Sequence, residues 1–266
     1  MNDGRKGSRG GVLSDALGLQ KREMISLTGA GGKTTLMFRL AKELSLAGKK
    51  VITTTTTKIL KPNNQESPHL FVSGDEGKIK EFVSRCLEQY GHITLAKEEV
   101  EKGKLKGISP ELADSLWHLY DMDALIIEAD GAAGRPIKAP REGEPVITSR
   151  TTLVVALLGM DGVGKELNDR NVFQAERISK LTGILEDEKI TEEGMALLMT
   201  HPEGVFKGAL GSSRRVAFLN KVDIPDGVTK AKKIARNIFG KGESTIDRVV
   251  LGQLMNEPPV VEVVFP

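Results

Sequence analysis

The chain has 266 residues, of which 38 are Lys or Arg and 36 are Asp or Glu, so its net charge is only +2. This length allows one large domain or two small ones, and such a chain can bury a core without a structural metal or disulfide. The balanced charge argues against a protein that coats a polyanion. The aromatic content of 4% argues against a stacking surface for single-stranded nucleic acid. We therefore expect no nucleic-acid partner.

The sequence shows no sign of a membrane or an oxidising compartment. No apolar run approaches the roughly 20 residues of a membrane-spanning helix, and the start MNDGRKGSRGG lacks the apolar core of a signal peptide. Cys86 is the only cysteine, which excludes an intramolecular disulfide. We expect a cytoplasmic protein without a membrane partner, in which residues 1–12 form a flexible N-terminus and residues 13–266 form a single domain.

Short apolar runs alternate with helical patterns along the chain. The apolar runs predict strands at Met24–Thr28, Val51–Thr54, Leu70–Val72, Ala124–Glu128, Leu153–Leu158, Val216–Leu219, Arg248–Leu251 and Val260–Phe265. The 3.6-residue patterns predict helices at Thr34–Ala47, Ile79–Tyr90, Pro110–Leu119, Phe173–Leu181, Thr191–Met199 and Thr229–Phe239. Strands that are apolar on both faces and alternate with helices favour a three-layer α/β fold. We expect a mainly parallel sheet covered by helices on both faces.

Three polar or turn-rich stretches interrupt this alternation. The segments 61–68 (KPNNQESP), 97–107 (KEEVEKGKLKG) and 131–148 are rich in Pro, Gly, Asn or charge. Such composition is typical of solvated connections between elements. No stretch has the composition of a linker that would require a second domain.

A glycine-rich loop follows the first predicted strand and opens the first long helix. Its residues are Gly29, Ala30, Gly31, Gly32, Lys33, Thr34 and Thr35. Glycines let successive N–H groups point inward around phosphate oxygens, and the helix N-terminus adds partial positive charge. In a P-loop the lysine reaches the β- and γ-phosphates and the next hydroxyl binds Mg²⁺. The first glycine of G-x-x-x-x-G-K-[ST] is replaced here by Leu27, so only G-x-x-G-K-T-T remains.

A second stretch, Gly159–Lys165, matches G-x-x-x-x-G-K in full. Glu166 stands where a P-loop carries Ser or Thr, so no hydroxyl is offered to Mg²⁺, and a carboxylate there would repel a triphosphate. We interpret this stretch as a loop between a strand and a helix, not as the main phosphate site.

The predicted strand 124–128 ends in two carboxylates, Glu128 and Asp130, which a period of two places on the same face. Carboxylates at a strand end beside a phosphate loop hold Mg²⁺ or orient its water. We therefore predict Lys33, Glu128 and Asp130 as catalytic residues and Thr34 with Asp130 as Mg²⁺ ligands. Arg135 and Lys138 follow in a Gly- and Pro-rich segment and are candidates to bind phosphate or another anion.

Two further motifs lie at predicted strand ends. The run VITTTTTK, ending at Lys58, reads as a strand because Thr favours strands, and its last residues are also placed to face a ligand. Asn220, Lys221 and Asp223 match the N-K-x-D motif of GTPases. In that motif the Asp carboxylate accepts hydrogen bonds from N1–H and the 2-amino group of guanine, donors that adenine lacks at those positions. We predict that these three residues contact the base.

Five stretches together resemble one known family. LTGAGGKTTLM, VITTTTTK, LIIEADGAAGRPIKAP, EPVI and LNKVD occur in the same order in the selenium-dependent hydroxylase accessory proteins called YqeC. The resemblance covers the chain from about Leu13 onward. It implies a P-loop NTPase-like fold and a role in the maturation of selenium-dependent molybdenum hydroxylases, with that hydroxylase or its cofactor as partner. The matching positions for phosphate are Gly29 and Gly31–Thr34, and those of the second motif are Glu128, Asp130, Arg135 and Lys138.

Three functions fit these features. The first is an Mg²⁺-dependent GTPase that acts as a maturation factor, with GTP favoured over ATP because of the N-K-x-D match. The second is an ATP-dependent ligase or kinase, because T-G-x-x-G-K-T-T also has the spacing of Mur-type amide ligases. The third is a nucleotide-gated scaffold that does not hydrolyse its nucleotide.

Overall fold

The computed structural model describes residues 12–100, 103–240 and 244–266. Most of the N-terminal segment expected to be flexible lies outside the described residues. Its last residue, Val12, instead begins a short helix, α1 (Val12–Leu17). No helix in the described ranges is long and apolar enough to cross a bilayer.

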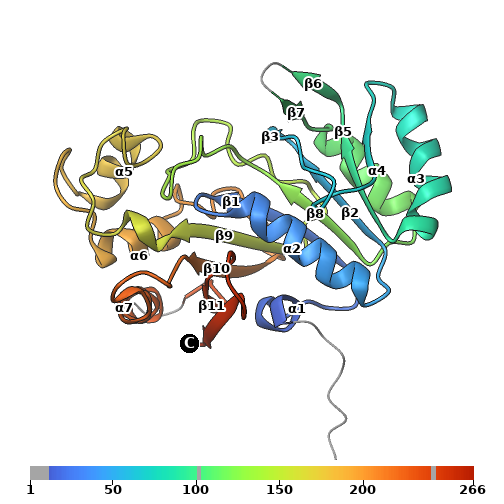
Figure 1. The fold of residues 1–266 in the computed structure, drawn as a ribbon. Coiled ribbons are helices and arrows are strands. Elements are labelled where there is room, and N and C mark those ends of the chain that lie inside the picture. Colours follow the sequence, from blue (N-terminus) through green and yellow to red (C-terminus); the bar gives the residue numbers. More distant parts are fainter. Residues whose placement is uncertain (1–11, 101–102, 241–243) are drawn as a thin grey trace, which may run out of the picture.

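One nine-stranded sheet forms the centre of the molecule (Figure 1). Eight strands pair in parallel, and only the last strand of the chain runs antiparallel to its neighbour. In sheet order the strands are β12 (Val260–Val264), β11 (Arg248–Gly252), β10 (Arg214–Asn220), β9 (Leu153–Gly159), β1 (Glu23–Gly29), β8 (Ala124–Glu128), β2 (Val51–Thr55), β5 (His92–Ala96) and β4 (Leu70–Val72). The expected mainly parallel sheet is confirmed.

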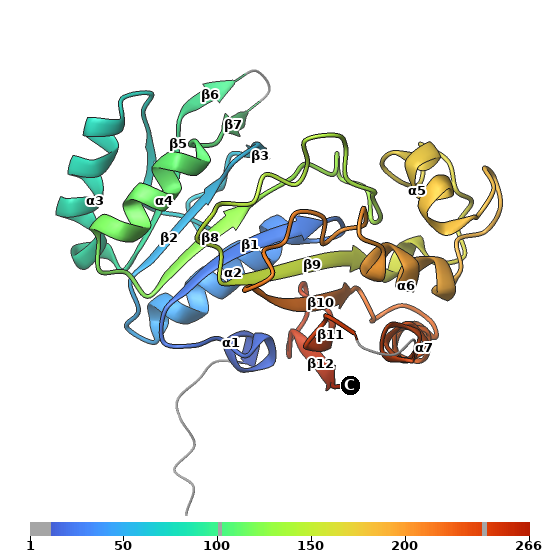
Figure 2. The ribbon, with the colours of Figure 1, turned by 180° about the vertical axis from the view of Figure 1, so that it is seen from behind.

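Helices cover both faces of this sheet (Figures 1 and 2). On one face α1 packs against α2 (Lys33–Leu46) and the two share a core with β1, β9 and β10. On the other face α3 (Glu76–Tyr90) and α4 (Pro110–Leu119) cover β2, β5 and β8. The same face of β9, β10 and β11 packs against α5 (Ala175–Thr182), α6 (Glu192–Thr200) and α7 (Gly227–Phe239). The molecule is therefore a three-layer α/β protein.

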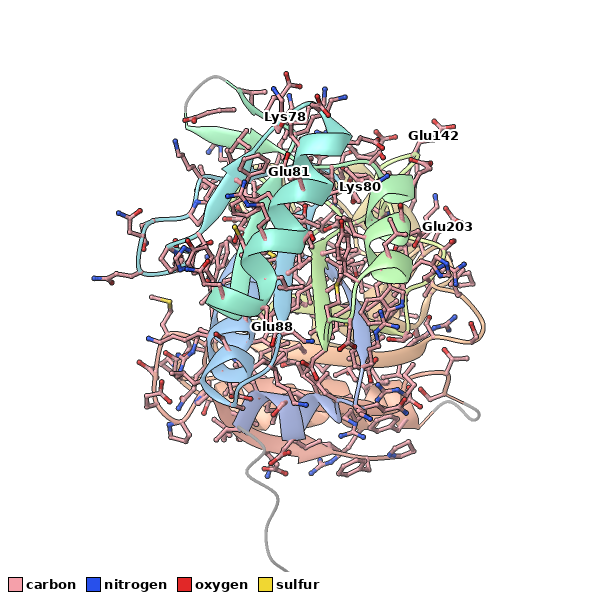
Figure 3. All side chains as sticks on the ribbon, turned by 90° about the vertical axis from the view of Figure 1, so that its right-hand side faces the viewer. Lys78, Lys80, Glu81, Glu88, Glu142 and Glu203 are labelled. Atoms are coloured by element: carbon pink, nitrogen blue, oxygen red, sulfur yellow. The ribbon has the colours of Figure 1, made fainter. Side chains whose placement is uncertain are left out.

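Local chemistry explains where the helices begin. The Asp75 carboxylate accepts hydrogen bonds from the N–H groups of Gly77 and Lys78, which caps α3. Ser109 caps α4 in the same way and Pro110 occupies its first turn, where its missing N–H costs nothing. The exposed face of α3 carries the charged side chains Lys78, Glu81 and Glu88, which are labelled in Figure 3.

In the segment before α4, one strand was not predicted and one expectation was wrong. The strand is β5, whose sequence HITLA is short and half polar; the hydroxyl of its buried Thr94 is hydrogen-bonded to those of Thr53 and Ser67. The stretch 97–107 is not a plain solvated connection. It contains β6 (Glu98–Val100) and β7 (Lys104–Lys106), which form a small antiparallel sheet with β3 (Lys58–Leu60). Buried Ile59 and Leu105 anchor this sheet to the α2 core, a tertiary contact that local composition does not reveal.

The carboxyl ends of the parallel strands lie at one edge of the sheet. The register places the end of β1 beside those of β8 and β9, and Asn220 at the end of β10 beside Gly159. Ligands of open α/β sheets bind outside this edge. The segment 129–152, which joins β8 to β9, passes over it (Figure 1).

Candidate functional site

The loop between β1 and α2 has the backbone shape that its glycines predict. Gly29, Gly31 and Gly32 have φ values of 84°, 79° and 139°, which residues with a side chain rarely adopt. A Cβ at Gly31 would lie 2.5 Å from the nitrogen of Gly159. The N–H groups of residues 31–35 have no acceptor within the described part of the chain, as expected at a helix N-terminus. These five donors have the arrangement that binds an anion at a helix N-terminus.

The first two loop residues contribute shape rather than free donors. The Gly29 N–H donates to the Asp130 carboxylate at 3.1 Å, and the Ala30 N–H donates to the Leu157 carbonyl at 2.8 Å. Both bonds tie the loop to its neighbouring strands. Of the residues predicted to bind phosphate, Gly31–Thr35 therefore line the cleft and Gly29 with Ala30 support it from behind.

Lys33 is buried and lies over the loop. Its Nζ donates to the Gly29 carbonyl at 2.6 Å and lies 3.2 Å from Asp130 Oδ1 and 3.7 Å from Glu128 Oε1. Burial would by itself lower the pKa of this ammonium, but the carboxylates of Asp130 and Glu128 outweigh burial and raise it above the usual value. Lys33 is therefore held as a cation at the phosphate loop.

The hydroxyl of Thr34 donates to Glu128 Oε2 at 2.7 Å. Burial raises the pKa of the Glu128 carboxyl above its usual range, and the nearby Lys33 and Thr34 offset only part of this effect. A carboxyl with a raised pKa beside a phosphate loop is suited to accept a proton from water. The predicted pairing of strand-end carboxylates with the loop is thus present in the geometry.

Asp130 lies at the centre of a buried ion network. Its Oδ2 accepts from Gly29 and lies 3.0 Å from the Nζ of Lys138, which is itself fully buried. Lys138 also donates to the Gly131 carbonyl at 2.7 Å and to Glu144 at 2.9 Å. Asp130 Oδ1 is buried and, apart from the ion pair with Lys33, makes no hydrogen bond among the described residues. Lys138 therefore positions Asp130 and has no donor left for a ligand.

The oxygen atoms beside the phosphate loop suit Mg²⁺, and they do not form a metal site made of protein ligands alone. Among the described residues no group of three or more His, Cys, Asp or Glu side chains is placed to hold a metal ion. Mg²⁺ needs fewer, because it keeps several waters and binds through one or two carboxylates plus substrate phosphates. The oxygen donors are Thr34 and Glu128, which share a hydrogen bond and line the cleft, and Asp130, whose Oδ1 lies beside the Nζ of Lys33.

The N-K-x-D residues divide into two groups. Asn220 is buried; its Nδ2 donates to the Gly31 carbonyl at 2.7 Å and its Oδ1 accepts from the Leu254 N–H at 3.0 Å. Lys221 lines the cleft and pairs with Asp161 at 2.8 Å. Asp223 is exposed, accepts a hydrogen bond from Asn256 and is not among the residues that line the cleft. Asn220 therefore fixes the phosphate loop to β10 and to the segment after β11.

The other candidate stretches have mainly structural roles. The hydroxyls of Thr53–Thr56 are all hydrogen-bonded to neighbouring strands or loops, and only Lys58 from that run lines the cleft. In the second glycine stretch, Met160–Gly162 forms a 3-10 turn and Lys165 is exposed outside the cleft. This agrees with its interpretation as a strand–helix loop.

A cleft of about 840 Å³ joins these groups. It is lined on the β10 side by Asn220, Lys221, Leu254 and Met255. The rest is lined by the small sheet and by the loops after β8 and β9, which carry the predicted Arg135 and residues that the sequence did not single out. Those additional residues are Lys104, Arg141, Glu144 and Phe173. They come from β7 and two loops, so no periodic pattern connects them; the only sequence signal is that Glu144 begins the EPVI stretch.

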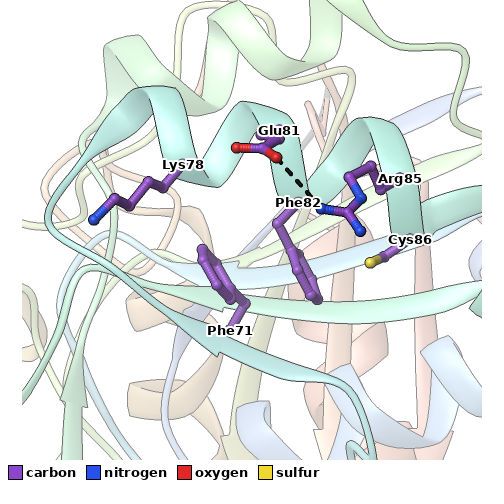
Figure 4. A pocket seen from close by; sticks show the side chains of 6 residues that line it. All are labelled: Phe71, Lys78, Glu81, Phe82, Arg85 and Cys86. Carbon is purple, nitrogen blue, oxygen red and sulfur yellow. Dashed lines mark hydrogen bonds and ion pairs between the residues drawn. The ribbon is translucent and has the colours of Figure 1, made fainter.

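A second cavity of about 410 Å³ lies beside the outermost strand β4, against α3 (Figure 4). Its floor is the stacked ring pair Phe71 and Phe82, with centroids 4.3 Å apart, and Cys86 lies beside it. Glu81 and Arg85 at its rim pair with each other. Nothing in this cavity contacts the loop, and it is not part of the site.

The fold and the loop define a class: a mainly parallel α/β protein with a P-loop-type strand–loop–helix unit at the carboxyl edge of its sheet. The YqeC family model matches residues 25–176. The Escherichia coli protein YqeC, described as uncharacterized, is 30% identical over 249 residues, which cover 92% of this chain and 93% of that protein. The chain belongs to the YqeC family.

Among solved structures, the chain is similar to the signal recognition particle 54 kDa protein of Aeropyrum pernix in complex with GDP. The identity is 16% and the TM-score is 0.36. The match covers 92% of this chain but spans less than half of that protein, 44% of its length.

Proposed function

We propose that this protein binds a nucleoside triphosphate with Mg²⁺ and hydrolyses it, with GTP favoured over ATP, as an accessory factor in the maturation of a selenium-dependent molybdenum hydroxylase. One observation carries the nucleotide part. Five N–H groups at residues 31–35 that have no acceptor among the described residues, the cationic Lys33 and two carboxylates meet at the carboxyl edge of the sheet. This combination matches the charges of a magnesium triphosphate.

Each residue has a distinct task in this proposal. The N–H groups of Gly31–Thr35 hold the phosphate oxygens, and Lys33 neutralises the β- and γ-phosphates. Thr34, Asp130 and the cleft-lining Glu128 would hold the metal ion and its waters, and the ion supplies further charge neutralisation when bound. Glu128, whose pKa is raised by burial, orients the attacking water and accepts its proton. Catalysis rests on positioning and electrostatics.

The preference for guanine rests on Asp223. The Asn220 side chain already hydrogen-bonds to Gly31 and Leu254, so in this proposal it supports the base site without contacting the base. Lys221 and Leu254 line the cleft and would contact the side of the guanine ring. Asp223 follows Lys221 by two residues and is held by a hydrogen bond from Asn256. In this proposal the Asp223 carboxylate exchanges its hydrogen bond from Asn256 for hydrogen bonds from the guanine edge. Each charge-assisted hydrogen bond of this kind is worth about 1.5–3 kcal/mol.

The test is nucleotide selectivity of Asp223→Asn. The asparagine amide offers a donor where xanthine has a carbonyl, so the variant should shift its preference from guanosine toward xanthosine triphosphate. Asp226→Asn, at an exposed position three residues further on, makes the same chemical change outside the motif and should leave the preference unchanged. Tighter binding of ATP than of GTP by the unaltered protein would refute the guanine assignment.

The maturation role rests on membership of the YqeC family and on what the resemblance implies for it. Turnover of GTP should rise when the partner hydroxylase is added. Unchanged turnover together with retained binding would instead favour a scaffold whose partner contacts depend on the bound nucleotide.

A further inference from the structure

The phosphate loop and the residues on the β10 side line only part of the cleft. The loop at β1 lies near its middle, since β9 and β10 follow on one side and β8 and β2 on the other. A nucleotide whose base lies toward Asn220 and Leu254 leaves free the part of the cleft that the small sheet and the loops after β8 and β9 line. We call this part the acceptor side; its lining includes Lys58, Lys104, Arg135, Arg141 and Phe173.

Positively charged side chains predominate on the acceptor side. Its cationic side chains Lys58, Lys104, Arg135 and Arg141 make no ion pair within the described residues. By contrast, the neighbouring lysines Lys61 and Lys106 are paired with Glu99 and Glu98. A cleft lined by one sign of charge attracts ligands of the opposite sign.

The acidic groups nearby are already committed. Glu144 receives a hydrogen bond from the buried Lys138, and Glu128 receives one from Thr34 and pairs with Lys33. Among the residues that the structure describes, the cations of the acceptor side therefore lie at the cleft without an ion-pair partner. Hydrolysis of the γ-phosphate by water does not require these additional cations, so they point to a different ligand.

The aromatic ring of Phe173 fixes one of these cations. The guanidinium of Arg141 lies 4.4 Å from the centre of the ring, and Lys138 lies 5.5 Å from it. Arg141 is itself exposed, so its position is set by this stacking while its N–H groups stay available. An arginine held by its flat face presents its donors edge-on, the geometry that binds carboxylate or phosphate with two hydrogen bonds.

We propose that the acceptor side binds a second ligand, a small organic anion with a carboxylate or phosphate group, next to the γ-phosphate end of the nucleotide. Arg141 and Arg135 would hold its anionic group, and Lys58 and Lys104 would add to the attraction. This inference rests on the proposed nucleotide function, because it assigns the β10 side of the cleft to the nucleotide.

The test is titration calorimetry at constant ionic strength, set with sodium chloride to keep screening equal. Inorganic phosphate and glutarate are titrated separately into protein that is saturated with a non-hydrolysable guanosine triphosphate analogue and Mg²⁺, and into protein without nucleotide. We expect saturable binding of at least one probe, weakened about tenfold or more by Arg141→Ala. Arg170→Ala removes an exposed arginine outside the cleft and should bind the probes like the unaltered protein.

The outcomes separate the two proposals. Binding of phosphate alone identifies a phosphorylated ligand, and binding of glutarate alone identifies a carboxylate. If neither probe gives heat that depends on Arg141 or on Arg135, the second site is refuted even when the nucleotide analogue binds. If the analogue does not bind but Arg141-dependent heat is seen, the anion site stands and the nucleotide proposal fails.

Discussion

Asn220 gives a sharp test of how the phosphate loop is held. Its side chain joins the Gly31 carbonyl at 2.7 Å to the Leu254 N–H at 3.0 Å, and it is 3% exposed. Asn220→Ala removes both bonds and leaves two buried backbone groups without partners. Each such group costs about 1–3 kcal/mol, and because water from the cleft can reach part of the gap we expect a total loss of about 2–4 kcal/mol.

The loss should appear as a lower urea midpoint without a change in slope. Triphosphate affinity should fall as well, because Gly31 loses the bond that fixes its carbonyl. Asp223→Asn, which alters an exposed member of the same motif, should change stability by less than about 0.5 kcal/mol. A loss below about 0.5 kcal/mol in Asn220→Ala would refute the bracing role, and equal losses in both variants would show that the motif acts as one unit.

Three further predictions concern stability. Gly31→Ala should cost well over the about 1–2 kcal/mol of a left-handed alanine, because its Cβ would meet Gly159, whereas Gly134→Ala, which has open space around it, should cost only that amount in urea titrations. Lys138→Met should cost about 3–5 kcal/mol by the same measurement, because it leaves buried carboxylate charge uncompensated; a loss under 1 kcal/mol would contradict this. Burial, aided by the charge of His69, lowers the pKa of His92 to about 4, below its ordinary 6.5, so stability should fall by about 2 kcal/mol as the pH drops from 8 to 5, and His92→Gln should lack this part of the pH dependence.

Much of the fold follows from local patterns in the sequence. All eight predicted strands and all six predicted helices are present, because strands such as Leu153–Gly159 are apolar on both faces and helices such as α4 have clear caps. What local patterns miss is structure that depends on distant partners. β5 is stabilised by hydroxyl bonds from Ser67 and Thr53, and the small sheet of β3, β7 and β6 depends on two anchoring apolar residues.

The site was predictable in its residues but only partly in their tasks. The spacing of Lys33, Glu128 and Asp130 relative to a strand end places them together, because parallel strands end at one edge. The sequence could not show that Lys138 is buried under Asp130 or that Asn220 turns toward the loop. Both depend on the direction in which a side chain points in the folded chain, which a sequence motif does not encode.

The central claim is that the loop before α2 holds a triphosphate, and equilibrium binding tests it most directly. Calorimetry with GTP, ATP and Mg²⁺ should give saturable heat with the unaltered protein. Lys33→Ala should weaken binding at least about tenfold, because a charged hydrogen bond of about 1.5–3 kcal/mol is lost. Lys165→Ala, at the exposed end of the second glycine stretch, should bind normally. Absence of heat with both nucleotides, or equal affinity in the unaltered protein and Lys33→Ala, would contradict the account.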